Sequence, residues 1–191
     1  MAISADDMLL VAIPNLLSLA RLCCVPLVVW LILVRRFDIA LGVFMLAGVT
    51  DAIDGFIAKR FDAVTELGKF IDPLADKALL VSVYITLAAV GSMPTWLVIL
   101  VVFRDVLIVG GSLLIHTMRQ KIVMNPLKIS KLNTVAQIVL AGVIMLRDGY
   151  DVMPDGIGGF LMAVVAATTF LSGAAYVWVW RRDITGVGEK T

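Results

Sequence analysis

The chain has 191 residues, of which 61% are hydrophobic and only 16% charged, and its formal net charge is +1. A soluble domain is about 45–50% apolar and about 25% charged, so this composition excludes an ordinary soluble protein and predicts an integral membrane protein. A net charge so close to zero also provides no basic face for nucleic acid.

Six apolar stretches are candidates for crossing a bilayer, which takes about 20 mostly apolar residues of helix. They predict an all-α integral membrane protein with six transmembrane helices, joined by short linkers that carry helix-breaking residues. The predicted spans are residues 12–34, 38–58, 70–90, 95–117, 132–147 and 157–180. The stretch before Pro14 predicts a short N-terminal interfacial segment. We expect one membrane domain over residues 1–182, followed by a polar C-terminal tail over residues 183–191.

Basic residues are divided unevenly between the two sets of loops. The second loop, the fourth loop and the C-terminal segment hold most of them: Lys59, Arg60, Lys69, Arg119, Lys121, Lys128, Lys131, Arg181, Arg182 and Lys190. The opposite side holds Arg35, Arg36 and Arg147. The positive-inside rule therefore predicts that both termini and loops 2 and 4 face the cytoplasm. No cleavable signal peptide is evident in MAISADDM, and the lack of a presequence favours a bacterial inner membrane over an organelle.

Carboxylates are concentrated between residues 51 and 77 of this otherwise apolar chain. Asp51 and Asp54 are three apart on one predicted helix, and Asp72 and Asp76 are four apart on the next, so each pair shares a helix face. A short cytoplasmic loop joins the two helices, which predicts antiparallel neighbours with both pairs at one depth. Four carboxylates so close together repel strongly unless cations lie between them. Oxygen ligands without nearby His or Cys indicate hard divalent ions, Mg²⁺, Mn²⁺ or Ca²⁺, and two ions would balance the charge.

Small residues accompany these aspartates. Gly55 and Gly68 each lie beside an acidic turn, where a missing side chain lets a ligand approach the backbone, and Ala58 lies one turn beyond Asp54. Carboxylates, metal ions and bare backbone together suit a phosphate or pyrophosphate ligand. The alternative, that the aspartates are solvated helix caps, is disfavoured because acids within a membrane segment are usually functional.

The spacing of these residues resembles the signature of the CDP-alcohol phosphatidyltransferase family. The matching pattern is Asp51-x2-Asp54-Gly55-x2-Ala58-Lys59-x8-Gly68-x3-Asp72-x3-Asp76. Lys59 stands where the family usually has arginine, so the charge is kept and the bidentate geometry is lost. The family core is itself six transmembrane helices, so the resemblance covers nearly the whole chain.

The resemblance implies an enzyme that uses a CDP-linked lipid and releases CMP. It implies that Asp51, Asp54, Asp72 and Asp76 hold two divalent ions, Mg²⁺ or Mn²⁺, and that these bind the pyrophosphate of CDP-diacylglycerol. Asp76 would also be the general base that takes the proton from the acceptor alcohol. The other residues of the CDP site would be Gly55, Ala58, Lys59 and Gly68. Family members are commonly homodimers, which implies a homodimer here.

Polar residues elsewhere in the chain bear on the acceptor alcohol. Asn15 and Arg21 belong to a stretch that looks like the family's opening and would point toward the site. Arg104 lies in the middle of a predicted span beside Asp105, and two interpretations stay open for it, a neutralised pair and a contact to a lipid phosphate. At the start of the fifth span, polar residues predict an acceptor-phosphate site: Lys131, Asn133, Thr134 and Gln137.

The same stretch favours one acceptor. Bacterial phosphatidylglycerophosphate synthases tend to show Gly-Lys-x-Lys-Thr-x2-Gln here, whereas Ser130-Lys131-Leu132-Asn133-Thr134-Val135-Ala136-Gln137 looks more like cardiolipin synthases of mitochondrial type. One lysine fewer suits a phosphodiester, because a phosphomonoester carries about −2 at neutral pH. We therefore expect phosphatidylglycerol as the acceptor, giving cardiolipin, with glycerol 3-phosphate as the alternative.

A cation-coupled membrane transporter is the rival prediction from another class, since it would also place acids inside the bilayer. Against it, the aspartates cluster at one membrane end rather than at the midplane, and the six spans show no evident inverted repeat. A purely structural membrane subunit would have no reason to carry this array of carboxylates.

Overall fold

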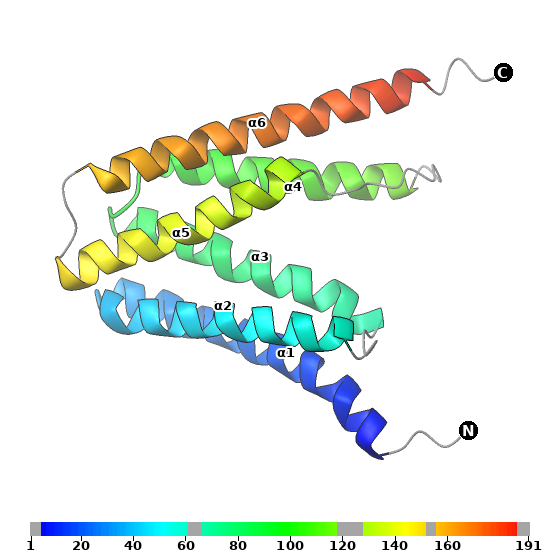
Figure 1. Ribbon diagram of the computed structural model, residues 1–191. Helices are drawn as coiled ribbons and strands as arrows, with labels where there is room; N and C mark the ends of the chain where they lie inside the picture. The colour runs from blue at the N-terminus through cyan, green and yellow to red at the C-terminus, as the bar shows by residue number, and fades with distance from the viewer. Residues whose placement is uncertain (1–4, 61–65, 118–127, 152–155, 187–191) are drawn as a thin grey trace. The chain divides into compact units, whose positions relative to one another are not determined.

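The computed structural model describes residues 5–60, 66–117, 128–151 and 156–186, with side chains at 19–50, 77–111, 129–151, 156–179 and 181. In these residues all regular secondary structure is helical (Figure 1). The helices are α1 (Ala5–Leu33), α2 (Phe37–Arg60), α3 (Glu66–Ala89), α4 (Thr95–Thr117), α5 (Lys128–Tyr150) and α6 (Ile157–Gly186). The predicted all-α fold is confirmed, and each helix contains most or all of one predicted span.

The helix ends differ from the predicted spans by up to seven residues, and the two largest differences are at the start of α1 and the end of α6. Helix α1 begins at Ala5 and continues through Pro14, so the predicted interfacial segment belongs to the same helix as the first span. A proline removes one hydrogen bond from a helix, and long apolar helices tolerate this where neighbouring groups compensate. Helix α6 continues to Gly186, inside the predicted polar tail, because no proline or glycine interrupts the chain between Gly173 and Gly186.

The chain folds into two compact units. Unit 1 contains Met1–Ser92 and Ala141–Met153, and unit 2 contains Met93–Leu140 and Pro154–Thr191, so α5 contributes to both. In unit 1, α1 packs against α2 and α3, and in unit 2, α4 packs against α6. The expectation of a single membrane domain over residues 1–182 stays a prediction.

Tight turns follow α1 and α3 in unit 1. Helix α1 ends in a pair of backbone hydrogen bonds, from Arg36 N to Leu31 O at 2.9 Å and from Arg35 N to Ile32 O at 3.0 Å. This pairing is the Schellman motif, which needs a residue in the left-handed conformation and usually has glycine there. Gly91 fills that position after α3 with a φ of 84°, whereas after α1 it is occupied by Arg35 with a φ of 62°.

The end of α5 lies directly against the start of α2. A Cβ atom added to Gly149 would come within 2.9 Å of the backbone nitrogen of Asp38 and 3.2 Å of the carbonyl carbon of Phe37. Glycine at this position therefore lets the two backbones touch. The core of unit 1 is aliphatic and aromatic around this contact, and its fully buried side chains include Val28, Ile32, Val83, Tyr84, Leu87 and Ile144.

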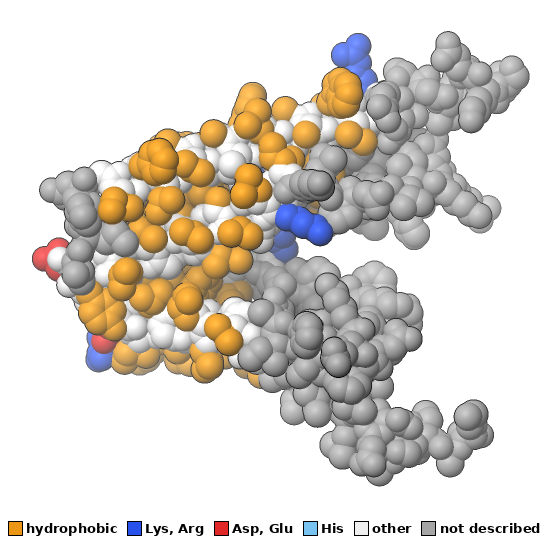
Figure 2. Space-filling model, viewed as in Figure 1, with side chains coloured by type: hydrophobic (Ala, Val, Ile, Leu, Met, Phe, Trp, Pro, Cys, Tyr) orange, Lys and Arg blue, Asp and Glu red, His pale blue; other side chains and the backbone are white. Residues whose placement is uncertain are grey.

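The outer faces of the helices are strongly apolar. Large hydrophobic side chains are widely exposed, among them Phe160 at 70%, Phe170 at 68% and Leu46 at 67%. Figure 2 shows hydrophobic side chains spread over the described surface, with charged ones near helix ends. Within the described residues, Ile129–Tyr150 and Ile157–Val179 are long and apolar enough to cross a membrane. Exposed apolar surface of this extent fits lipid as the surrounding medium better than water.

Candidate functional site

The aspartates of the predicted metal site lie on two helices of unit 1. Asp51 and Asp54 belong to α2, and Asp72 and Asp76 belong to α3. The backbone is helical at all four positions, so residues three or four apart share a helix face, as the spacing argument requires. The side chains lie outside the described residues, and the facing of the two pairs stays a prediction. The same holds for the contacts expected of Asn15, Gly55, Ala58, Lys59 and Gly68.

Elsewhere in the chain there is no competing metal site, as far as the described side chains show. Among them, no group of three or more His, Cys, Asp or Glu residues could hold a metal ion.

The predicted acceptor residue Arg21 is on α1, is 4% exposed and belongs to unit 1. A buried guanidinium needs polar partners to compensate for the water it has lost. Arg21 lies on the helix that contacts both aspartate-bearing helices.

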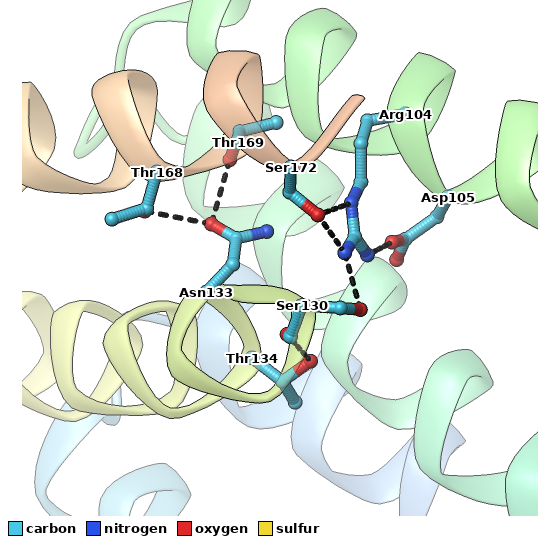
Figure 3. A network of polar contacts seen from close by, with 8 residues as sticks. All are labelled: Arg104, Asp105, Ser130, Asn133, Thr134, Thr168, Thr169 and Ser172. Atoms are coloured by element: carbon cyan, nitrogen blue, oxygen red, sulfur yellow. Dashed lines mark hydrogen bonds and ion pairs between the residues drawn. The ribbon is translucent and has the colours of Figure 1, made fainter. Parts of the chain in front are cut away.

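Unit 2 has a polar cluster in its interior, shown in Figure 3. We use the name unit 2 polar cluster for the following residues of α4, α5 and α6: Arg104, Asp105, Ser130, Asn133, Thr134, Thr168, Thr169 and Ser172. Only three of them were predicted site residues. The hydroxyl groups on α6 had a sequence signal, since Thr168, Thr169 and Ser172 interrupt an apolar stretch at helical spacing. Polar residues in a membrane helix tend to face other helices.

Arg104 is the centre of this cluster. Its Nη1 donates to Asp105 Oδ1 at 2.7 Å, its Nε donates to Ser172 Oγ at 3.1 Å, and its Nη2 donates to the hydroxyls of Ser130 and Ser172. These four hydrogen bonds use most of the five N–H donors of an arginine. Both members of the ion pair are buried, at 4% and 7% exposure. The neutralised pair, one of the two interpretations from the sequence, is therefore present, and a contact to a lipid phosphate stays a prediction.

The amide of Asn133 forms the second half of the cluster. Asn133 is 0% exposed, and its Oδ1 accepts hydrogen bonds from Thr168 Oγ1 at 2.8 Å and Thr169 Oγ1 at 2.9 Å. Among the described residues, its Nδ2 has no hydrogen-bond partner. Gln137, one turn further along α5, is also 0% exposed. Asn133 and Gln137, two of the predicted acceptor residues, are thus buried in the interior of unit 2.

The polar residues predicted as an acceptor site at the start of α5 therefore lie in two different environments. Lys131 is exposed, and Thr134 is half-buried, with its hydroxyl donating to the backbone oxygen of Ser130 at 3.2 Å. Asn133 and Gln137 are buried one helical turn apart. Of the predicted acceptor residues on α5, Lys131 is the most exposed.

The family model for CDP-alcohol phosphatidyltransferases matches residues 11–172. A cardiolipin synthase (CMP-forming) from Rattus norvegicus is 32% identical over 198 residues, which cover 93% of this chain and 64% of the relative. The Homo sapiens cardiolipin synthase (CMP-forming) is 31% identical over 192 residues, covering 90% of this chain and 62% of the relative. A CDP-diacylglycerol–glycerol-3-phosphate 3-phosphatidyltransferase from Bacillus subtilis is 28% identical over 181 residues, covering 86% of this chain and 92% of the relative.

These matches agree with the signature found between residues 51 and 76. The chain spans less than two thirds of the length of the rat and human relatives, and most of the length of the bacterial one. The family match includes the two aspartate-bearing helices and the unit 2 polar cluster up to Ser172. The chain therefore belongs to the CDP-alcohol phosphatidyltransferase family.

Proposed function

We propose that the protein transfers the phosphatidyl group of CDP-diacylglycerol to phosphatidylglycerol, forming cardiolipin and CMP. The observation that carries this proposal is the complete aspartate signature on α2 and α3, within a family match over residues 11–172. The choice of acceptor is supported by the rat and human relatives, which are named CMP-forming cardiolipin synthases and match 93% and 90% of this chain. The sequence from Ser130 to Gln137 supports the same acceptor.

The donor atoms of the signature suit divalent cations. Asp51, Asp54, Asp72 and Asp76 offer only carboxylate oxygens, which hard ions such as Mg²⁺ and Mn²⁺ prefer, and four negative charges match two such ions. When bound there, the ions would neutralise negative charge on the pyrophosphate of the donor lipid. The absence of side chains at Gly55 and Gly68, and the small Ala58, would leave room for the cytidine end. The charge of Lys59 suits a phosphate oxygen.

The chemical step needs one proton acceptor from the chain, and Asp76 has that role in our proposal. The acceptor's hydroxyl oxygen forms a bond to the phosphorus nearest the diacylglycerol. The bond between that phosphorus and the oxygen bridging to CMP breaks, and CMP leaves with the electron pair. The hydroxyl proton passes to the Asp76 carboxylate, which must therefore be ionised when the acceptor binds.

We further propose that all six helices cross the membrane, with the signature end and both termini in the cytoplasm, and that the protein is a homodimer. Each helix has 23 or more residues, which is enough to cross a hydrocarbon core of about 30 Å. The uneven distribution of Lys and Arg between the loops supports this orientation.

Glycerol 3-phosphate is the alternative acceptor, and one observation favours it. The Bacillus subtilis relative, named for transfer to glycerol 3-phosphate, matches over 92% of its length, so its length is similar to that of this chain. The charge of the ligand argues against this alternative. Glycerol 3-phosphate is a phosphomonoester, which carries about −2 at neutral pH and would need more cationic contacts than Lys131 alone provides.

Release of CMP tests the proposal directly. Purified protein in detergent, given CDP-diacylglycerol, phosphatidylglycerol and Mg²⁺, should release CMP, and both EDTA and Asp76→Asn should abolish the release. Asp38→Asn is the matched control, because Asp38 is at the other end of α2 from the signature, and it should leave the rate within about twofold. No CMP release, together with ion flux into liposomes, would show a transporter instead.

A competition experiment separates the two acceptors. Phosphatidylglycerol and glycerol 3-phosphate are offered together, and the lipid products are identified by mass spectrometry. Cardiolipin should predominate. If only glycerol 3-phosphate supports CMP release, the acceptor assignment is wrong, whereas the donor lipid and the family are unaffected.

A further inference from the structure

Unit 1 contains an open recess at the end opposite to the aspartate signature. Its volume is about 480 Å³, within the range of about 300–1,000 Å³ that small-ligand sites occupy. We call it the Arg35 recess, and its lining residues are Arg35, Phe37, Val90, Gly91, Ser92, Arg147 and Asp148. They come from the α1–α2 turn, the α3–α4 turn and the end of α5, all within unit 1.

The recess is far from the proposed chemistry. Phe37 begins α2, whereas Asp51 and Asp54 are 14 or more residues further along the same helix. At 1.5 Å per residue, the recess and the signature are separated by about 20 Å along the helix. A ligand in the recess would therefore be distinct from the donor lipid.

Arg35 is held in this recess by an unusual backbone conformation. Its φ of 62° is left-handed, which disfavours any residue with a Cβ atom, and glycine at this helix end would avoid the cost. Its Nη2 donates to the carbonyl oxygen of Val90 at 2.8 Å, and its guanidinium lies 6.0 Å from the centroid of the Phe37 ring. Such strained residues tend to occur where a side chain has a function. The turn alone would be satisfied better by glycine, so the presence of arginine at this position indicates a role for its side chain.

The charges around the recess leave Arg35 without a counter-ion among the described residues. Arg147 Nε pairs with Asp148 Oδ1 at 2.7 Å, and its Nη2 donates to the carbonyl oxygen of Ser92 at 3.3 Å. Arg36, just outside the recess, pairs with Asp38 at 3.3 Å. Both other arginines of this end are therefore paired, and the lining residues keep one net positive charge, on Arg35. The exposed Asp151, which follows α5, does not line the recess.

The recess lies where lipid headgroups are expected. Arg147 is in the last turn of α5, and residues Ile129–Tyr150 of this helix are long and apolar enough to cross a membrane. Basic residues at the end of a membrane helix lie at the level of lipid phosphates. A guanidinium also matches the oxygen atoms of a phosphate geometrically, because its N–H groups form a planar fork.

We propose that the Arg35 recess binds the phosphodiester group of an anionic phospholipid, in the leaflet opposite to the aspartate signature. The single unneutralised guanidinium matches the single negative charge of a phosphodiester. The lipid's acyl chains would lie along the apolar outer surface of the helices. A free phosphate shares the oxygen chemistry and lacks the acyl chains, so it serves as the contrasting ligand in the test.

The test compares two neighbouring arginines that differ in this role. Arg35→Asn removes the charge from the recess, and asparagine tolerates the left-handed conformation better than most residues, so the turn should be kept. Arg36→Asn is the matched control, because Arg36 is paired with Asp38 and does not line the recess. Delipidated protein in neutral detergent is titrated with phosphatidylserine, which is anionic, and with phosphatidylcholine, and binding is followed by native mass spectrometry.

We expect the wild type and Arg36→Asn to bind phosphatidylserine about five- to tenfold more tightly than phosphatidylcholine, and Arg35→Asn to lose this preference. Equal preference in all three proteins would overturn the proposal. Inorganic phosphate should not displace the bound lipid; if phosphate binds with the same dependence on Arg35 and phosphatidylserine does not bind, the lipid assignment is wrong. Should Arg35→Asn fail to fold, Arg147→Gln provides the second variant, since it leaves Asp148 to cancel the charge of Arg35 and should also abolish the preference.

Discussion

Arg104 donates to the hydroxyl oxygen of Ser172 through both Nε and Nη2, which joins α4 to α6 across 68 residues of sequence. Through Nη2 it also donates to Ser130, so one buried side chain connects three helices of unit 2. Because α5 also carries Lys131, the Arg104 contact to Ser130 fixes the position of the turn that presents this exposed lysine.

Replacing Ser172 with alanine should destabilise unit 2. Two N–H groups of a buried, charged side chain would lose their acceptor, and such a loss costs about 1–3 kcal/mol. Thr86→Ala is the control, since Thr86 is also buried and, among the described residues, its hydroxyl donates within its own helix, to Ser82 O at 2.6 Å. Thermal unfolding in detergent should show a clear decrease for Ser172→Ala and a much smaller one for Thr86→Ala. Equal decreases would mean that the link between α4 and α6 adds nothing.

The helices could be predicted from the sequence, because apolar length and helix breakers determine where a membrane helix starts and stops. The exceptions are the ends, where the chain is not apolar. Pro14 and the run Arg181-Arg182-Asp183 suggested boundaries, yet α1 and α6 continue across them. A helix continues past a proline where neighbouring groups compensate for the hydrogen bond it removes, and hydropathy does not report on such compensation.

Gly149→Ala should weaken the contact between α5 and α2. The added Cβ would come within 2.9 Å of Asp38 N, which is backbone and cannot rotate away, so the helices must separate at a cost of about 1–3 kcal/mol. Gly142→Ala is the control on the same helix, because its Cβ would meet only the flexible end of Leu41 at 3.9 Å. That variant should be neutral or more stable by up to about 1 kcal/mol, since alanine favours helix. Identical unfolding temperatures for both variants would contradict the close approach.

The candidate site was only partly predictable, because spacing shows which residues share a face and not which neighbours they meet. The sequence singled out Asn133 and Gln137 together with Lys131, yet the structure buries the first two and exposes the third. The sequence also indicated no partner for Arg104 other than Asp105. The hydroxyl partner Ser172 lies on a helix distant in sequence, and pairing of that kind is decided by tertiary packing.

The pair of Asn133 and Thr169 should show strong non-additivity. Asn133→Leu removes the one acceptor that the Thr169 hydroxyl has among the described residues and leaves this buried hydroxyl unsatisfied, whereas Thr168 keeps its own-helix acceptor Val164 O at 2.8 Å. We expect Asn133→Leu to cost about 1–3 kcal/mol, and the double variant with Thr169→Val to recover much of that loss. A double-mutant cycle by thermal unfolding measures this. A double variant no more stable than Asn133→Leu alone would show that the hydrogen bond contributes little.

Lys131 should act on the acceptor and not on the donor lipid. It is exposed at the start of α5, and none of the ion pairs within the described residues involves it, so its ammonium is available to a phosphate. We expect Lys131→Gln to raise the KM for phosphatidylglycerol about tenfold while kcat and the KM for CDP-diacylglycerol stay within about twofold. Lys131→Arg should restore most of the affinity, because it returns the charge, and Arg36→Gln should have no effect on either KM. A fall in kcat with both KM values unchanged would instead place Lys131 in the chemical step, and unchanged kinetics would remove it from the acceptor site.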